Sequence, residues 1–312
     1  MNILKIKNYF TAKDKLNTYI MLCSNIAVFL MAFIFSIIMT NYSSVEDYGK
    51  YKYAANFILT IPAILGFGID HSCSRLVAST KLKDTEKVIF ISIFCTVILS
   101  IIITIILHVG MSISPLIRKI FTESIYTVIP FITVFMLRNI IAMIYQGTGE
   151  ILKISLFNVI PYVIIISFSI FFLLIYGEVT FKNAIYTFLI ANLIIIIPRM
   201  LDLKLSIKHM KESFLLLTKE IKENGFNVYL SSIFTRTASQ LIGLFCGGYY
   251  GYIEYGYYAL ALSMAGSFRL ISSSMATAKY RENARSESIH KNDLIFLLIS
   301  NFIVFIVFLI LI

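Results

Sequence analysis

The residues best suited to chemistry in this sequence are three arginines that interrupt long apolar runs, Arg138, Arg236 and Arg269. Because an arginine at the centre of a membrane helix costs roughly 2.5–3.5 kcal/mol on insertion scales, each is expected to face protein or water rather than lipid. A guanidinium is a planar fork of donors that can bind phosphate oxygens in a bidentate manner. The arginines therefore predict a site for an anionic group. The structural alternative is that they extend to an interface or cap helix ends.

Polar side chains recur near these arginines at helical spacing. The longest polar face surrounds Arg236, and milder polar stripes occur on two predicted helices closer to the N-terminus. Hydroxyl and amide groups of this kind can hydrogen-bond the hydroxyls of a sugar. The predicted substrate-binding set is Arg138, Arg236, Arg269, Ser232, Ser239, Gln240, Asn25 and Asn158.

No arrangement of side chains in the sequence suits covalent or metal chemistry. No Asp or Glu is expected deep in an apolar run, and Asp70, Glu123 and Glu254 come closest to one. The four cysteines and four histidines are scattered, without the spacing of a metal site. Neither a carboxylate pair, nor a nucleophile with its base, nor a glycine-rich phosphate loop is evident. We therefore expect no catalytic residues, no metal and no cofactor.

The elements that must hold these residues are membrane-spanning helices. The chain is 58% hydrophobic and only 14% charged, whereas soluble domains carry about 25% charged residues. Its uncharged runs are long enough to cross about 30 Å of hydrocarbon as helices, and they lack the alternation of a membrane barrel. The fold class predicted is therefore all-α, a polytopic membrane protein with about nine crossings. They are expected at 18–40, 51–69, 88–109, 124–144, 154–176, 183–201, 226–248, 257–275 and 294–312.

The placement of basic residues orients the predicted helices. With the N-terminus inside, 19 of the 27 lysines and arginines fall in inner segments and five in outer ones. This asymmetry follows the positive-inside rule and predicts a cytoplasmic N-terminus. The net charge of +10 therefore comes from basic residues that lie mostly between the predicted spans and orient them. For this reason nucleic acid is not an expected partner. The longest inner loop, 202–225, has apolar residues at alternating steps of four and three, which predicts an amphipathic helix on the inner leaflet.

Two segments 207 residues apart share a pattern: residues 46–51 read EDYGKY and residues 253–258 read IEYGYY. Each is preceded by a predicted span and followed by a weak span, a basic inner loop and a strong span. This order predicts a parallel repeat of six-helix halves, with the glycines in tight turns and the tyrosines at the membrane interface. The expected organisation is a six-helix bundle at 1–201, a connector helix at 202–225 and the first three helices of a second bundle at 226–312. A longer transporter, truncated here, is therefore expected.

Several of these segments resemble a known family. Residues 46–51, followed by Gly66-Phe67-Gly68 and Arg75, resemble the N-terminal signature of Wzx-type polysaccharide flippases of the multidrug/oligosaccharidyl-lipid/polysaccharide exporter (MOP) superfamily. Residues 146–150 (QGTGE) resemble that family's link into the fifth span, and residues 256–262 (GYYALAL) resemble its second-half counterpart. The resemblance covers essentially the whole chain. Family members usually have twelve or more helices, so the missing helices are the main departure.

The resemblance implies a transporter rather than an enzyme. Its cargo would be a polyprenyl-diphosphate-linked oligosaccharide, carried on undecaprenyl and flipped from the cytoplasmic to the outer leaflet of the bacterial cytoplasmic membrane. The product would serve O-antigen, lipopolysaccharide or capsule synthesis. The partners implied are membrane lipids, the lipid-linked oligosaccharide and the polysaccharide polymerase machinery.

Other functions remain open at this point. A multidrug-type exporter of the same superfamily would need acidic residues facing its cavity. A membrane-embedded polysaccharide polymerase or ligase would need a large outer loop, and the predicted outer loops have only about 7–14 residues. A structural scaffold without transport activity is the remaining alternative.

Overall fold

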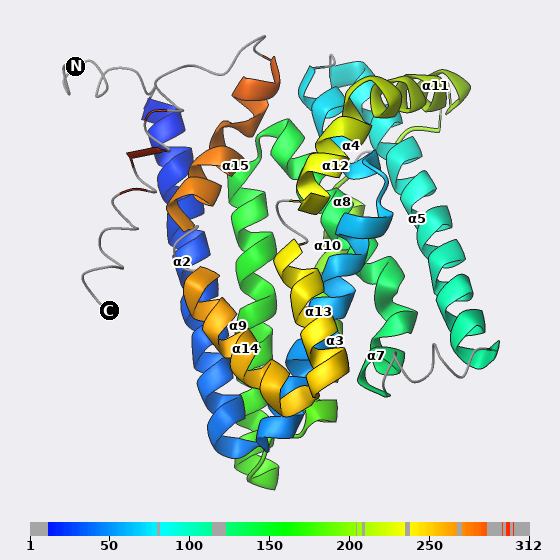
Figure 1. The fold of residues 1–312 in the computed structure, drawn as a ribbon. Helices are drawn as coiled ribbons and strands as arrows, with labels where there is room; N and C mark the ends of the chain where they lie inside the picture. Colours follow the sequence, from blue (N-terminus) through cyan, green and yellow to red (C-terminus); the bar gives the residue numbers. More distant parts are fainter. Residues whose placement is uncertain are drawn as a thin grey trace.

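The computed structural model describes residues 12–79, 82–113, 123–203, 205–207, 210–234, 238–266 and 270–285, together with 295, 298, 299 and 302. Every regular element within these residues is a helix, so the predicted all-α class is confirmed. Figure 1 shows long helices packed side by side, with α11 lying across one end of the bundle. The elements are α2 (Ala12–Tyr42), α3 (Val45–Leu65), α4 (Ile69–Ser79), α5 (Leu82–Ile113), α7 (Glu123–Val128), the 3-10 turn η1 (Ile129–Phe131), α8 (Ile132–Thr148), α9 (Ile151–Tyr176), α10 (Phe181–Asp202), α11 (Met210–Glu220), the π-helical turn η2 (Ile221–Gly225), α12 (Phe226–Ser232), α13 (Ala238–Tyr250), α14 (Tyr252–Gly266) and α15 (Leu270–Arg285).

Six of the predicted crossings coincide with helices that are long and apolar enough to span a bilayer. Within the described residues, five single helical segments meet this condition, and the pair α3 and α4 meets it as one bent span. The predicted seventh and eighth crossings fall on shorter helices, α12 to α15, which have 7, 13, 15 and 16 residues. The predicted ninth crossing, at 294–312, lies almost wholly outside the described residues. A polytopic membrane protein is thus confirmed, and nine crossings stay a prediction.

The second crossing is broken rather than straight. The helices α3 and α4 meet at 64°, because Phe67 (φ 46°) and Gly68 (φ 76°) lie in the left-handed region that ends a helix. The chain that follows the predicted second span is helical rather than irregular, since α4 continues from Ile69 to Ser79. The bend therefore carries Asp70 into the bundle.

Local signals set the ends of the other helices. The Ser44 side chain accepts a hydrogen bond of 3.0 Å from the backbone N–H of Asp47 and caps α3, and Thr180 caps α10 through the N–H of Asn183. Such N-caps satisfy amide groups that the helix itself leaves unpaired. At the opposite ends, α8 and α9 each stop at a glycine with φ above 70°.

The helices differ in how much of their apolar surface lies inside the protein. In the apolar 18-residue stretch of α10, half is buried inside the protein. The buried share is only 17% in α9 and 22% in α2. Ile132 and Ile141 of α8 have no exposed surface and lie in the core. The bundle is therefore organised around α8 and α10, while α2 and α9 present apolar faces outward, as a lipid-facing helix must.

The connector is helical over a shorter range than predicted. It forms α11 and then passes through η2 directly into α12. Within the predicted apolar stripe, Leu217 is buried with 1% exposure, whereas Met210 and Phe214 remain 41% and 49% exposed. An ion pair of 3.4 Å between Arg75 and Glu220 joins α4 to the end of α11. The connector thus packs against the first bundle with one face and leaves apolar side chains on another.

Candidate functional site

The two copies of the repeated pattern lie against each other. Helix α3 begins at Val45 and α14 at Tyr252, which is again an offset of 207 residues. A Cβ atom added to Gly49 would collide with the carbonyl oxygen of Tyr252, and one added to Gly256 would lie 3.5 Å from the carbonyl oxygen of Val45. Because these residues are equivalent in the repeat, the contact is reciprocal. It is the arrangement expected of parallel repeats related by an axis along the membrane normal.

The structure corrects the roles predicted for the repeated glycines and tyrosines. Gly49 and Gly256 are the fifth residues of α3 and α14, so they lie within the helices instead of forming turns between them. Tyr48 and Tyr255 of the repeated pattern, predicted at the membrane interface, are packed inside the protein with only 2% exposure each, and Tyr53 beside the pattern is 3% exposed. The rings of Tyr53 and Tyr255 meet edge to face at 5.3 Å. These aromatic residues therefore pack between the helices of the two halves.

Hydrogen bonds join the first bundle, α2 to α10, to α13 and α15 of the second half. The Asn25 amide nitrogen of α2 lies 2.7 Å from the Ser274 hydroxyl of α15, and Ser274 is fully buried. The Asn56 amide of α3 donates a 3.0 Å hydrogen bond to the main-chain carbonyl of Gln240 in α13. Neutral hydrogen bonds of this kind are worth about 0.5–1.5 kcal/mol each. They can therefore be exchanged for ligand hydrogen bonds at small cost.

Two of the four residues in these contacts were predicted from the sequence, and two were not. Asn25 and Gln240 were predicted, although Gln240 contributes its main chain rather than its side chain. Asn56 and Ser274 were not predicted. The signal for them was present, because both lie in the weak spans whose small and polar residues lowered their hydropathy.

The other predicted site residues are placed differently. Arg138 of α8 lies 5.8 Å from the ring centroid of Phe157 in α9, a cation–π contact inside the first bundle. Asn158 follows Phe157 on α9 and is half-buried. The Ser232 hydroxyl donates to the carbonyl of Tyr229 at 2.8 Å, within its own turn. Arg236 and Arg269 lie outside the described residues, as does the side chain of Ser239.

A buried carboxylate also lies near the contact between the two halves. Asp70 is 8% exposed; its Oδ2 accepts a 2.6 Å hydrogen bond from the Asn139 amide of α8, and its Oδ1 accepts from the His71 backbone N–H at 2.9 Å. Asp70, predicted to lie near the end of a span, is therefore buried inside the protein in the first turn of α4. Among the described residues, Asp70 and Lys279 are the only buried charged side chains. An acidic residue two positions after the Gly66-Phe67-Gly68 sequence was the available signal.

Comparisons with known proteins agree with this architecture. A family model described as polysaccharide biosynthesis protein matches residues 15–280. No curated protein matches the chain. Solved structures that resemble it include a mutant of the Vibrio cholerae MATE transporter VcmN, with a TM-score of 0.62, 12% identity and coverage of 94% of this chain and 68% of that one.

Two further structures show the same likeness. A MATE structure in the straight conformation has a TM-score of 0.62, 17% identity and coverage of 96% of this chain and 71% of that one. A MOP superfamily transporter from Pyrococcus furiosus has a TM-score of 0.58, 16% identity and coverage of 95% and 71%. At such identities the likeness concerns the fold. Because the family match covers most of its length, the chain belongs to the polysaccharide biosynthesis protein family, and its fold is that of the MOP-superfamily transporters.

Proposed function

We propose that this protein flips a polyprenyl-diphosphate-linked oligosaccharide across the cytoplasmic membrane by opening the contact between its first six helices and α13–α15. The observation that carries the proposal is the pair of hydrogen bonds that Asn25 and Asn56 make across this contact. When the halves separate, these side chains are free to bind sugar hydroxyls. Membership of the polysaccharide biosynthesis family supports this choice of cargo.

The diphosphate of the cargo needs cationic partners. Arg236 and Arg269 follow α12 and α14 in the sequence, within the half that contributes α13 and α15. Since a hydrogen bond to a charged group contributes about 1.5–3 kcal/mol, losing one such arginine should weaken transport about 10- to 150-fold. Arg138, already placed against Phe157, is the weaker candidate.

Alanine at either arginine should therefore reduce surface polysaccharide in a complementation assay. We expect Arg236→Ala and Arg269→Ala to lose at least nine-tenths of the polysaccharide restored by the wild-type gene, and Arg→Lys variants to retain part of it. Lys182→Ala, which removes an exposed basic residue of α10, is the control and should leave the level unchanged. Protein levels are compared by immunoblot. Wild-type polysaccharide in both alanine variants would rule out the proposed cationic site.

Linking α2 to α15 should stop transport if the two halves must separate. With the four native cysteines replaced by serine or alanine, cysteines are introduced as Asn25→Cys and Ser274→Cys. The two native side chains lie 2.7 Å apart, so ethanediyl bis-methanethiosulfonate should join the new thiols. Surface delivery of polysaccharide should fall on linking and recover after reduction. The single-cysteine variants serve as controls, and undiminished transport by fully linked protein would contradict alternating exposure at this contact.

Asp70 favours one second candidate function. An exporter of cationic drugs requires an acidic residue in its interior, and Asp70 provides a buried carboxylate. Deletion of the gene separates the two functions: greater sensitivity to cationic drugs, with unchanged polysaccharide, would favour the exporter. Loss of polysaccharide with unchanged drug sensitivity favours the flippase.

A further inference from the structure

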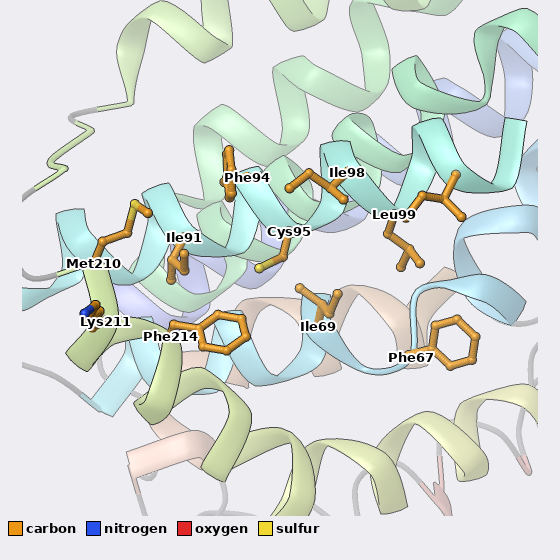
Figure 2. A pocket seen from close by; sticks show the side chains of 11 residues that line it. Phe67, Ile69, Ile91, Phe94, Cys95, Ile98, Leu99, Met210, Lys211 and Phe214 are labelled. Atoms are coloured by element: carbon orange, nitrogen blue, oxygen red, sulfur yellow. The ribbon is translucent and has the colours of Figure 1, made fainter. Parts of the chain in front are cut away.

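An apolar groove whose described lining includes one lysine lies on the outside of the first bundle, apart from the contact between the two halves. Its volume is about 520 Å³, within the ~300–1,000 Å³ range of small-molecule sites. Figure 2 shows it between α5, the α3–α4 break and α11. The lining residues are Phe67, Ile69, Ile91, Phe94, Cys95, Ile98, Leu99, Ile102, Met210, Lys211 and Phe214.

The groove has the length of one membrane leaflet. Its α5 residues follow one helical face from Ile91 to Ile102, which is about 16 Å at a rise of 1.5 Å per residue. Half of a hydrocarbon core of about 30 Å is similar in length. Because α5 is itself a candidate membrane span, a single acyl chain from one leaflet matches the groove in both length and polarity.

The two ends of the groove differ in charge. Among the described residues that line it, only Lys211 is charged, and it lies beside Met210 at the opposite end from Phe67 (Figure 2). Lys211 is exposed, and among the described residues no carboxylate forms an ion pair with it. An occupant therefore needs an apolar tail along α5 and a negative head group beside α11.

We propose that this groove binds an anionic phospholipid of the cytoplasmic leaflet, with one acyl chain along α5 and its phosphate beside Lys211. The cytoplasmic side follows from the distribution of basic residues, which assigns the 202–225 connector to the inside. A polyprenyl chain, which is much longer than one leaflet, fits a groove of this length less well. The phospholipid would attach α11 to α5 and so hold the connector of the two halves on the membrane surface.

Native mass spectrometry of the purified full chain in detergent tests this binding. The probes are palmitoyl-oleoyl phosphatidylglycerol, phosphatidylcholine with the same chains, and undecaprenyl phosphate. Since one lysine near an anionic surface contributes about 1 kcal/mol, we expect phosphatidylglycerol to bind about fivefold more tightly than phosphatidylcholine. Lys211→Gln should remove that preference and leave phosphatidylcholine binding unchanged.

Two further variants separate the tail from the head group. Ile98→Trp, which fills the groove at an exposed position of α5, should weaken both phospholipids. Lys222→Gln removes an exposed lysine of η2 outside the groove and should change neither. Equal binding of the two phospholipids, or equal effects of Lys211→Gln and Lys222→Gln, would overturn the proposal. Displacement of phosphatidylglycerol by equimolar undecaprenyl phosphate would also overturn it and would assign the groove to the transported lipid.

Discussion

Replacing Gly49 with valine should disrupt the packing of the two halves and greatly reduce the yield of folded protein. The new side chain would begin at a Cβ atom that overlaps the carbonyl oxygen of Tyr252. That oxygen belongs to the backbone of α14 and cannot rotate away, unlike the end of a side chain. Overpacking a core costs about 1–3 kcal/mol and occasionally more, and we expect about 3 kcal/mol or more here. Thermal unfolding of the purified protein measures the loss.

Two alanine substitutions in α14 provide matched controls. At Gly256 the added Cβ would lie 3.5 Å from Val45, an ordinary contact, and at Gly266 it would meet no atom within 4 Å. Both variants should unfold at or slightly above the wild-type temperature, because neither adds a clash and alanine favours a helix over glycine by about 1 kcal/mol. If Gly49→Val is as stable as Gly266→Ala, the close approach of α3 and α14 is not present in the native protein.

Replacing Asp70 with leucine should destabilise the α4–α8 contact by about 1–3 kcal/mol. The substitution removes the acceptor of the Asn139 amide, which lies 2.6 Å from the carboxylate. A buried donor left without a partner costs about that much. Asp70→Asn retains an acceptor oxygen, so this variant should lose less stability than Asp70→Leu. Thermal unfolding in detergent, with and without a second Asn139→Leu substitution, measures the coupling between the two side chains.

An exposed aspartate gives the contrast. Asp202 pairs with Arg199 at 2.9 Å, with its side chain 44% exposed. Because surface ion pairs contribute about 0–1 kcal/mol, Asp202→Leu should change the unfolding temperature little. If Asp70→Leu and Asp202→Leu lower the unfolding temperature by similar amounts, the buried Asp70–Asn139 hydrogen bond contributes no more to stability than a surface ion pair does.

Much of the fold could be predicted from local sequence. Apolar runs long enough to cross hydrocarbon identify α2, α5, α8, α9 and α10, because lipid imposes length and hydropathy on a helix regardless of its neighbours. The break between α3 and α4 was not predicted. The hydropathy of a run does not reveal which of its residues adopts a left-handed backbone conformation, as Phe67 does. The site was predicted less well. Asn25 was found as a polar residue in an apolar helix, but its partner Ser274 is 249 residues away.

The sequence by itself determined the membrane helices, the gathering of basic residues in alternate predicted loops and the repeat that relates residues 46–51 to 253–258. The tertiary structure alone decided what the repeat does: it places Gly49 against α14 and buries Tyr48 and Tyr255 between the halves. It also decided that Asp70 is an interior residue. The physical reason is that hydropathy depends on each residue's own transfer from water to lipid. Close approach and buried hydrogen bonds depend on pairs of residues that only folding brings together.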